Sequence, residues 1–161
     1  MILILMGVVG SGKTTVGRLF AQQLQWKFAD ADDFHPAANI EKIRQGISLN
    51  DEDRRPWLEL LRANIETWSS AGVNVVLACS ALKESYRKEL TTGPDVQFVY
   101  LKGSADLIAR RLGLRQGHFA GAQILASQLA DLEEPKSAIA VDIDKPPEQI
   151  VSEIRDKLHL A

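Results

Sequence analysis

The most informative segment of this chain is Gly7-Val8-Val9-Gly10-Ser11-Gly12-Lys13-Thr14. It matches the pattern G-x-x-x-x-G-K-[ST], and it lies between an apolar run, residues 2–5, and a segment with helical periodicity, residues 16–24. A strand, a glycine-rich loop and a helix in this order form a phosphate-binding loop. The loop N–H groups surround an anion, and the helix from about Thr14 adds the positive end of its dipole. The chain is therefore predicted to bind a nucleoside triphosphate.

The side chains that end this loop have separate expected roles. Lys13 is expected to reach the β- and γ-phosphates, and the Thr14 hydroxyl is expected to hold Mg²⁺. The predicted nucleotide-binding residues are Gly7, Val8, Val9, Gly10, Ser11, Gly12, Lys13, Thr14 and Thr15, joined by Arg111 and Arg115 from a later loop.

Length and composition restrict the class of protein. The 161 residues suit one domain, residues 1–161, and a net charge of −2 without a basic run argues against nucleic acid as the main partner. The N-terminal apolar run is too short for a signal peptide or a membrane span, so no membrane partner is expected. The single cysteine, Cys79, cannot form an internal disulfide, which fits a reducing cytoplasm.

Apolar runs and helical patterns alternate along the whole chain. This order predicts a three-layer α/β/α fold with a parallel sheet of about five strands and helices on both faces. Pro56 is expected within the first turn of a long helix that follows Asn50. Residues 30–72 are expected to contain the substrate-binding region, and a mobile lid is expected at about 114–135. Strands are predicted at 2–6, 26–29, 73–78, 96–101 and 139–143, and helices at 14–25, 38–45, 51–70, 81–90, 105–112, 122–132 and from 146 onward.

An acidic cluster follows the second predicted strand, at the sheet edge where open α/β folds bind ligands. It contains Asp30, Asp32 and Asp33. A carboxylate facing the γ-phosphate can accept the proton of an acceptor hydroxyl or ligate Mg²⁺ through water, and Asp32 is the residue we select for these roles. The alternative is a solvated acidic turn or a helix cap.

Three arginines are candidates for binding anions. Arg54, near the start of the long helix, can bind a carboxylate or phosphate in a bidentate manner. Arg111 and Arg115 lie four residues apart at the mouth of the glycine-bounded loop, where they can clamp the triphosphate and support catalysis when a lid closes. The alternative for all three is a solvated surface position. His118, in the same loop, either contacts substrate or packs within the loop.

A phosphate-binding loop alone does not distinguish a motor, a switch and a small-molecule kinase. Motors and GTPases have an aspartate for Mg²⁺ at the end of a later strand. At the matching place, after the predicted strand 73–78, this chain has Cys79-Ser80. It also lacks an N-K-x-D run for reading guanine. Cys79 has no adjacent histidine to activate it, so we assign it to packing or to the lining of the substrate site.

Several further motifs together resemble the gluconokinase family of P-loop sugar-acid kinases. The resemblance covers nearly the whole chain in order, and its most specific pieces are Asp-Asp-x-His-Pro, Cys-Ser-Ala-Leu-Lys and Gly-His-Phe. The matching segments are residues 7–14, 30–36, 49–54, 56–57, 78–83, 86–87, 117–119, 127–128 and 141–142, with Asn39, Gly46, Arg111 and Arg115. Ser48 and Ala120-Gly121 depart from the family pattern, and the second departure bears on lid closure.

The resemblance implies ATP-dependent phosphorylation of D-gluconate at its 6-hydroxyl, with Mg²⁺, by an enzyme with a nucleoside-monophosphate-kinase-like fold that often forms a homodimer. In this scheme Lys13, Asp32, Arg111 and Arg115 are catalytic, and Thr14 and Asp32 hold the metal. The implied substrate-binding residues are Asp32, His35, Arg54, Lys83, His118 and Gln128. Two alternatives stay open: a kinase of the same fold that acts on shikimate, a nucleoside monophosphate or adenylyl sulfate, and a nucleotide-dependent switch.

Overall fold

The computed structural model describes residues 1–113 and 119–161, and its strands form one parallel five-stranded sheet in the order β2-β3-β1-β4-β5. The strands are β1 (Ile2–Met6), β2 (Lys27–Asp30), β3 (Val75–Ala78), β4 (Val96–Lys102) and β5 (Ile139–Asp142). The α-helices are α1 (Lys13–Leu24), α2 (Ala37–Arg44), α3 (Asp51–Ser70), α4 (Glu84–Leu90), α5 (Ala105–Arg111), α6 (Phe119–Asp131) and α7 (Pro147–Lys157), and a 3-10 helix, η1, spans Ala31–Phe34.

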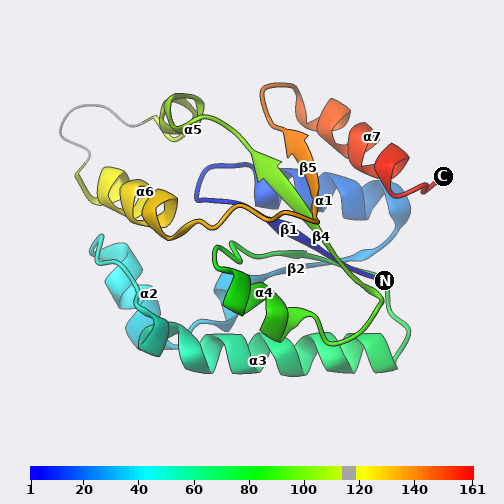
Figure 1. The fold of residues 1–161 in the computed structure, drawn as a ribbon, viewed down its shortest axis with the longest axis horizontal. Coiled ribbons are helices and arrows are strands. Elements are labelled where there is room, and N and C mark those ends of the chain that lie inside the picture. Colours follow the sequence, from blue (N-terminus) through cyan, green and yellow to red (C-terminus); the bar gives the residue numbers. More distant parts are fainter. Residues whose placement is uncertain (114–118) are drawn as a thin grey trace.

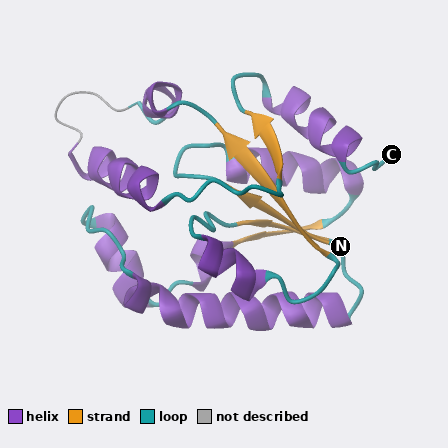
Figure 2. Ribbon diagram, in the orientation of Figure 1, coloured by secondary structure: helices purple, strands orange, loops and turns teal. Residues whose placement is uncertain are grey.

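Helices cover both faces of the sheet, as Figure 1 shows and Figure 2 repeats by element type. The central strand β1 is fully buried, and its side chains alternate between two cores. Ile2, Ile4 and Met6 pack with α3 and α4, whereas Leu3 and Leu5 pack on the side of α1, α5 and α7. The three-layer α/β/α fold predicted from the sequence is thus confirmed.

The sheet topology determines where a ligand site can form. Because every strand is parallel to its neighbours, all five carboxyl ends lie along one edge of the sheet. β3 lies between β1 and β2, so the loops after these three strands are adjacent. The phosphate-binding loop follows β1 and the acidic cluster follows β2, which places both at the same edge.

Two local expectations differ from the structure. Pro56 lies in the second turn of α3, because a capping box between Asn50 and Asp53 starts this helix at Asp51. The Pro56 nitrogen therefore cannot donate to the carbonyl of Glu52. α4 begins at Glu84, three residues later than expected, because Ala81 adopts a left-handed φ of 44° that helical geometry excludes.

Among the described residues, none of the helices combines the length and the apolar composition that crossing a membrane requires.

Candidate active site at the carboxyl edge of the sheet

The phosphate-binding loop adopts a conformation that depends on its glycines. Gly10 and Gly12 have φ values of 79° and 96°, in the left-handed region that other residues rarely adopt. A Cβ on Gly10 would lie 2.6 Å from the side chain of Leu112, so space as well as conformation excludes a larger residue there. Gly12 caps α1, and the positive end of this helix faces the loop.

Lys13 is folded back over the loop. Its Nζ donates hydrogen bonds of 3.0 Å to the carbonyls of Gly7 and Val8. Burial lowers the pKa of Lys13, and the carboxylates of Asp32 and Asp30 oppose that effect. The hydrogen bonds to the two carbonyls hold the Lys13 ammonium against the loop, where the phosphates of a nucleotide would bind.

One cleft brings the phosphate-binding loop and the acceptor-side residues together. Its volume is about 330 Å³, which is within the range of small-molecule sites. Of the predicted site residues, the cleft is lined by Val9, Gly10, Gly12, Lys13, Thr14, Thr15, Asp32, His35, Arg54 and Gln128.

The carboxylates of the acidic cluster take different positions. Asp30 Oδ2 accepts a 3.3 Å hydrogen bond from the Thr14 hydroxyl, and Asp30 Oδ1 accepts from the Asp32 backbone N–H. Asp32 itself lines the cleft, where desolvation, followed by the nearby Asp30 carboxylate, raises its pKa. Asp32 and Asp33 are both exposed, but only Asp32 belongs to the cleft lining. Sequence reasoning selected Asp32 over Asp30 and so missed the pair with Thr14.

Arg54 is held in place from two sides. It is only 8 % exposed, and its guanidinium donates to the Tyr86 hydroxyl at 3.0 Å and to Asp131 Oδ2 at 3.2 Å. Asp131 ends α6, so this ion pair connects the long helix α3 with the helix that follows residues 114–118. Anchored in this way, the guanidinium remains part of the cleft lining.

His35 and Gln128 are fixed by different neighbours. The His35 ring stacks on Trp57 with 4.6 Å between ring centroids, and burial together with the Arg54 charge lowers its pKa to about 4. Gln128 Oε1 accepts a 2.7 Å hydrogen bond from the Val9 N–H, so α6 contacts the phosphate-binding loop directly. Trp57 lines the cleft as well, a role that its helical spacing did not reveal.

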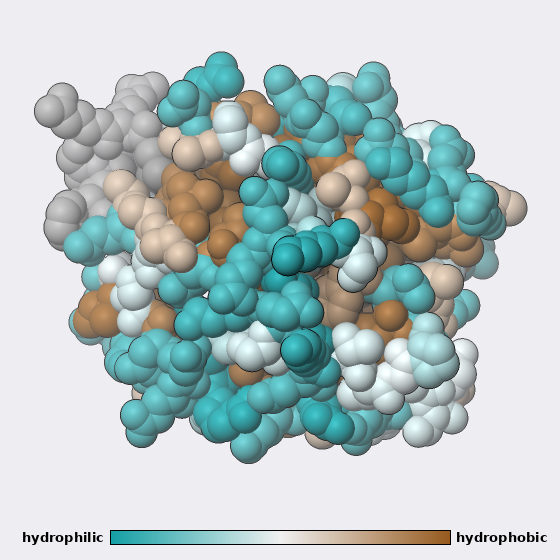
Figure 3. Space-filling model, viewed as in Figure 1, coloured by the Kyte–Doolittle hydropathy of each residue, from teal (hydrophilic) through white to brown (hydrophobic). Residues whose placement is uncertain are grey.

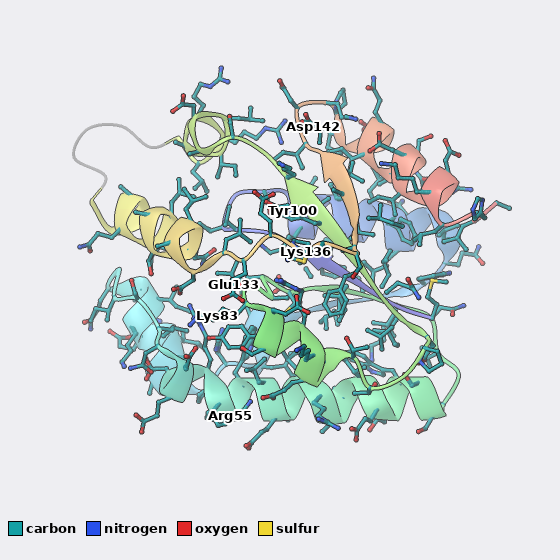
Figure 4. The ribbon with its side chains drawn as sticks, in the orientation of Figure 1. Arg55, Lys83, Tyr100, Glu133, Lys136 and Asp142 are labelled. Atoms are coloured by element: carbon teal, nitrogen blue, oxygen red, sulfur yellow. The ribbon has the colours of Figure 1, made fainter. Side chains whose placement is uncertain are left out.

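Lys83 does not line this cleft. It lies at the start of α4, as Figure 4 shows, and its Nζ donates to Asp51 Oδ1 at 2.9 Å. The same carboxylate accepts a hydrogen bond from Tyr86, which also contacts Arg54. Lys83 is therefore connected to Arg54 through the hydrogen bonds of Asp51 and Tyr86, and it does not line the cleft.

Arg111 lines a second cavity, on the other side of the phosphate-binding loop. This cavity is bounded by Gly10, Ser11, Gly12 and Thr15 of the loop and by residues 144–147 after β5. The Arg111 guanidinium donates to the carbonyl of Ile143, which fixes it beside that segment. The other two predicted residues of the loop, Arg115 and His118, lie outside the described residues.

Cys79 is buried between the sheet and the α3–α4 layer. Burial raises the pKa of its thiol to about 12, so it remains protonated at neutral pH. The Cys79 side chain packs in the core, which agrees with packing, one of the two roles predicted from the sequence; the other, lining the substrate site, is not seen in the cleft.

Comparison with known proteins identifies the family. The model of the shikimate kinase family matches residues 9–159. A probable gluconokinase of Xenopus tropicalis is 45 % identical over 177 aligned residues, which cover 98 % of this chain and 93 % of the relative. The thermoresistant gluconokinase of Escherichia coli is 44 % identical, and the alignment covers 94 % of this chain and 89 % of the relative. The chain belongs to the gluconokinase family.

A solved structure of this family supports the same assignment. The crystal structure of a gluconokinase from Sinorhizobium meliloti superposes with a TM-score of 0.81 at 37 % identity, and the alignment covers 98 % of this chain and 94 % of the other. The expectation of a gluconokinase-family kinase, formed from the sequence motifs, is therefore confirmed at the level of family and fold.

Proposed function

We propose that this gluconokinase-family protein transfers the γ-phosphoryl group of ATP to the 6-hydroxyl of D-gluconate, giving 6-phospho-D-gluconate and ADP. One observation carries the proposal: the phosphate-binding loop and the acceptor-side residues Asp32, His35 and Arg54 line a single cleft. The names of the relatives support gluconate as the acceptor.

In this proposal ATP lies along the phosphate-binding loop, with its adenine in the second cavity. The phosphates are bound by the Lys13 ammonium and by backbone N–H groups of the loop other than those of Gly7, Val9 and Ser11, which donate to Ser80, Gln128 and Val8. Arg111, at the rim of that cavity, faces the same nucleotide. On ATP binding, Lys13 exchanges its hydrogen bonds to the carbonyls of Gly7 and Val8 for phosphate oxygens.

The residues beside the loop suit Mg²⁺, which prefers oxygen ligands and keeps several of its waters. The Thr14 hydroxyl and the Asp30 carboxylate are already adjacent, and Asp32 lies in the same cleft. We propose that Thr14 holds the ion directly, and that Asp30 and Asp32 hold its waters. Bound there, Mg²⁺ would neutralise phosphate charge.

Asp32 is the proposed general base. Its carboxylate orients the 6-hydroxyl and accepts its proton as the hydroxyl oxygen bonds to the γ-phosphorus. The bond from that phosphorus to the β–γ bridging oxygen breaks, and ADP leaves with the bond electrons. The raised pKa of Asp32 suits this role, because a more basic carboxylate accepts a proton more readily.

The remaining acceptor contacts are proposed for the sugar acid's carboxylate and hydroxyls. Arg54, His35 and Gln128 line the cleft and are proposed to contact these groups, and Gln128 also borders the phosphate side of the cleft through its hydrogen bond with Val9. Apolar side chains also line the cleft: Ile43 and Ile47 come from the α2 region, and Ile124 comes from α6. Brown patches over these elements are visible in Figure 3. We propose that residues 114–135, with Arg115 and His118, act as a lid that excludes water.

Further properties of the protein are part of the same proposal. We propose that residues 1–161 form one domain, that residues 30–72 contain the acceptor-binding region, and that the protein forms a homodimer, as the family resemblance implies. The ATP requirement and the free thiol of Cys79 support a cytoplasmic location. Light scattering on the purified protein tests the dimer.

An acceptor screen with Mg-ATP tests the proposed activity. ADP release is measured with D-gluconate, shikimate, a nucleoside monophosphate, adenylyl sulfate and no acceptor, and the product is identified by ³¹P NMR. We expect ADP release that depends on gluconate and a phosphate monoester on its primary alcohol. Preference for another acceptor would replace gluconate, and slow ATP hydrolysis that no acceptor changes would indicate a nucleotide-dependent switch.

A further inference from the structure

The His35 side chain is constrained on one ring face and at one ring nitrogen. Its ring is nearly parallel to Trp57, with 9° between the planes, and the Trp57 indole N–H donates to the Ala31 carbonyl at 2.8 Å. His35 Nδ1 lies 3.2 Å from the side-chain nitrogen of Asn39. These contacts leave the ring little freedom to rotate, so the position of its proton determines what it offers a ligand.

Asn39 determines where that proton lies. This side chain is 3 % exposed, and its amide nitrogen is 2.8 Å from the backbone carbonyl of Asp53. A carbonyl oxygen can only accept, so the Asn39 atom facing it must be the NH₂ group and not the amide oxygen. The second hydrogen of the same NH₂ group then points to His35 Nδ1. That nitrogen must therefore be unprotonated, because two donors cannot share this contact.

The proton of the neutral ring consequently resides on Nε2. None of the described residues forms a hydrogen bond with this nitrogen. It is also not one of the buried polar atoms without a partner in that part of the chain, so it is accessible. His35 lines the cleft beside Arg54 and Trp57. The accessible N–H therefore adds a directional donor to a site where the Arg54 guanidinium also donates.

We propose that Asn39 is a positioning residue that fixes His35 as the Nε2–H tautomer, so that His35 donates a hydrogen bond to an oxygen of the acceptor and transfers no proton. The identity of that acceptor rests on the proposed function. The tautomer itself follows from Asp53, Asn39 and His35 alone. Asn39 need not touch the substrate; it acts through the ring that does.

The first test uses ¹⁵N NMR of the histidine side chains in the wild-type protein at pH 7.5. Comparison with a His35→Gln sample identifies the His35 signals. We expect the proton on Nε2 and an unprotonated Nδ1. A proton on Nδ1, alone or together with one on Nε2, would overturn the proposal; the tautomer itself is read from the wild-type protein, and the variant serves only to assign the signals.

The second test is Asn39→Asp, with Asn64→Asp as the matched control, because the partly buried Asn64 amide also donates to a backbone carbonyl, that of Leu60. The carboxylate that this substitution introduces accepts from His35 Nδ1 instead of donating to it, which moves the proton. We expect the NMR signature to change and the KM for gluconate to rise about tenfold, the cost of roughly one hydrogen bond, with the KM for ATP nearly constant. An unchanged His35 tautomer in a folded variant would refute the role of Asn39.

The third test addresses His35 as a donor. His35→Leu removes the N–H, whereas His35→Gln can return one, and the exposed His159→Gln serves as the control. We expect the KM for gluconate to rise about tenfold in His35→Leu and to be partly restored in His35→Gln. Equal losses in both variants would contradict the donor role. If no acceptor is phosphorylated yet NMR finds the Nε2–H tautomer, the proposed function fails while the positioning by Asn39 stands.

Discussion

The backbone N–H of Val9 donates a 2.7 Å hydrogen bond to Oε1 of Gln128, so helix α6 is joined to the phosphate-binding loop. The two residues are 119 positions apart in the chain. The N–H groups of this loop are the proposed phosphate ligands, and the amide side chain of Gln128 therefore lies where the phosphates of ATP approach. A charge introduced at residue 128 should therefore change the affinity of the protein for ATP.

Gln128→Glu tests this relationship with a side chain of nearly the same shape. Its carboxylate still accepts from Val9 but repels the phosphates, so we expect the KM for ATP to rise about tenfold, which equals ~1.4 kcal/mol. Steady-state kinetics with varied ATP measure the effect. Gln97→Glu, on an exposed position of β4, supplies the control for net charge. Equal ATP KM values in the two variants would show that Gln128 does not face the phosphates.

Asp32→Asn should separate catalysis from stability. Loss of the general base should lower kcat by about 10²- to 10⁴-fold while ATP still binds. Desolvation at the cleft and the Asp30 carboxylate raise the pKa of Asp32, so the fold disfavours the ionised form, and removing this charge at pH 7 should raise the melting temperature. Calorimetry and single-turnover kinetics measure the two effects, with exposed Asp33→Asn as the control. Wild-type turnover in Asp32→Asn would assign the base to another residue.

The raised pKa of Asp32 also predicts the acidic limb of the pH–rate profile. Because the folded pKa of Asp32 is higher than its ordinary value of 3.8, kcat should begin to fall at a pH above the range in which an unperturbed aspartate titrates. The proton bound by the folded form also means that the Asp32 contribution to stability improves as pH falls through this pKa. A profile that stays flat down to pH 4 would contradict the role of Asp32 as base.

Asp131→Asn tests whether the ion pair with Asp131 is needed to position the Arg54 guanidinium. The neutral amide weakens the ion pair, but the Tyr86 hydroxyl still holds the guanidinium, so we expect a several-fold rise in the KM for gluconate. Arg54→Ala should raise it far more, and the KM for ATP should change little in either variant. Arg55→Ala, which loses a pair with Glu89 instead, serves as the control. A selective effect of Arg54→Ala on ATP would show that Arg54 is not on the acceptor side.

Alkylation tests the environment of Cys79. Burial raises the pKa of this thiol to about 12, so iodoacetamide should leave the native enzyme active at pH 8 and should modify Cys79 only after unfolding. Mass spectrometry of native and denatured samples measures the modification. Rapid labelling of the native protein together with loss of activity would contradict the buried position.

The general architecture was predictable because it follows from local patterns. The glycines of the phosphate-binding loop and the apolar run of β1 identify the strand–loop–helix unit by themselves, and the alternation of elements gives the parallel sheet. The sheet edge that collects Thr14 and Asp32 follows from the topology. The predicted ends of helices were less accurate where the backbone conformation of one residue sets them, as the left-handed Ala81 does before α4.

The details of the site depend on contacts between residues far apart in the chain. No spacing rule links Thr14 to Asp30, or Arg54 to Asp131, because each contact depends on how two packed elements meet. Lys83 looked like a substrate ligand from its motif, but its partner is Asp51 at the start of α3. The role of Asn39 became visible only when the Asp53 carbonyl fixed the orientation of its amide.

A crystal structure with a non-hydrolysable ATP analogue, Mg²⁺ and D-gluconate would show whether Asp32 acts on the primary alcohol. It would measure the distance from the Asp32 carboxylate to the oxygen of the primary alcohol. We predict a hydrogen-bond distance of about 3 Å, with that oxygen aligned for attack on the terminal phosphorus. A primary alcohol well beyond contact with Asp32, or turned away from the terminal phosphate, would contradict the account.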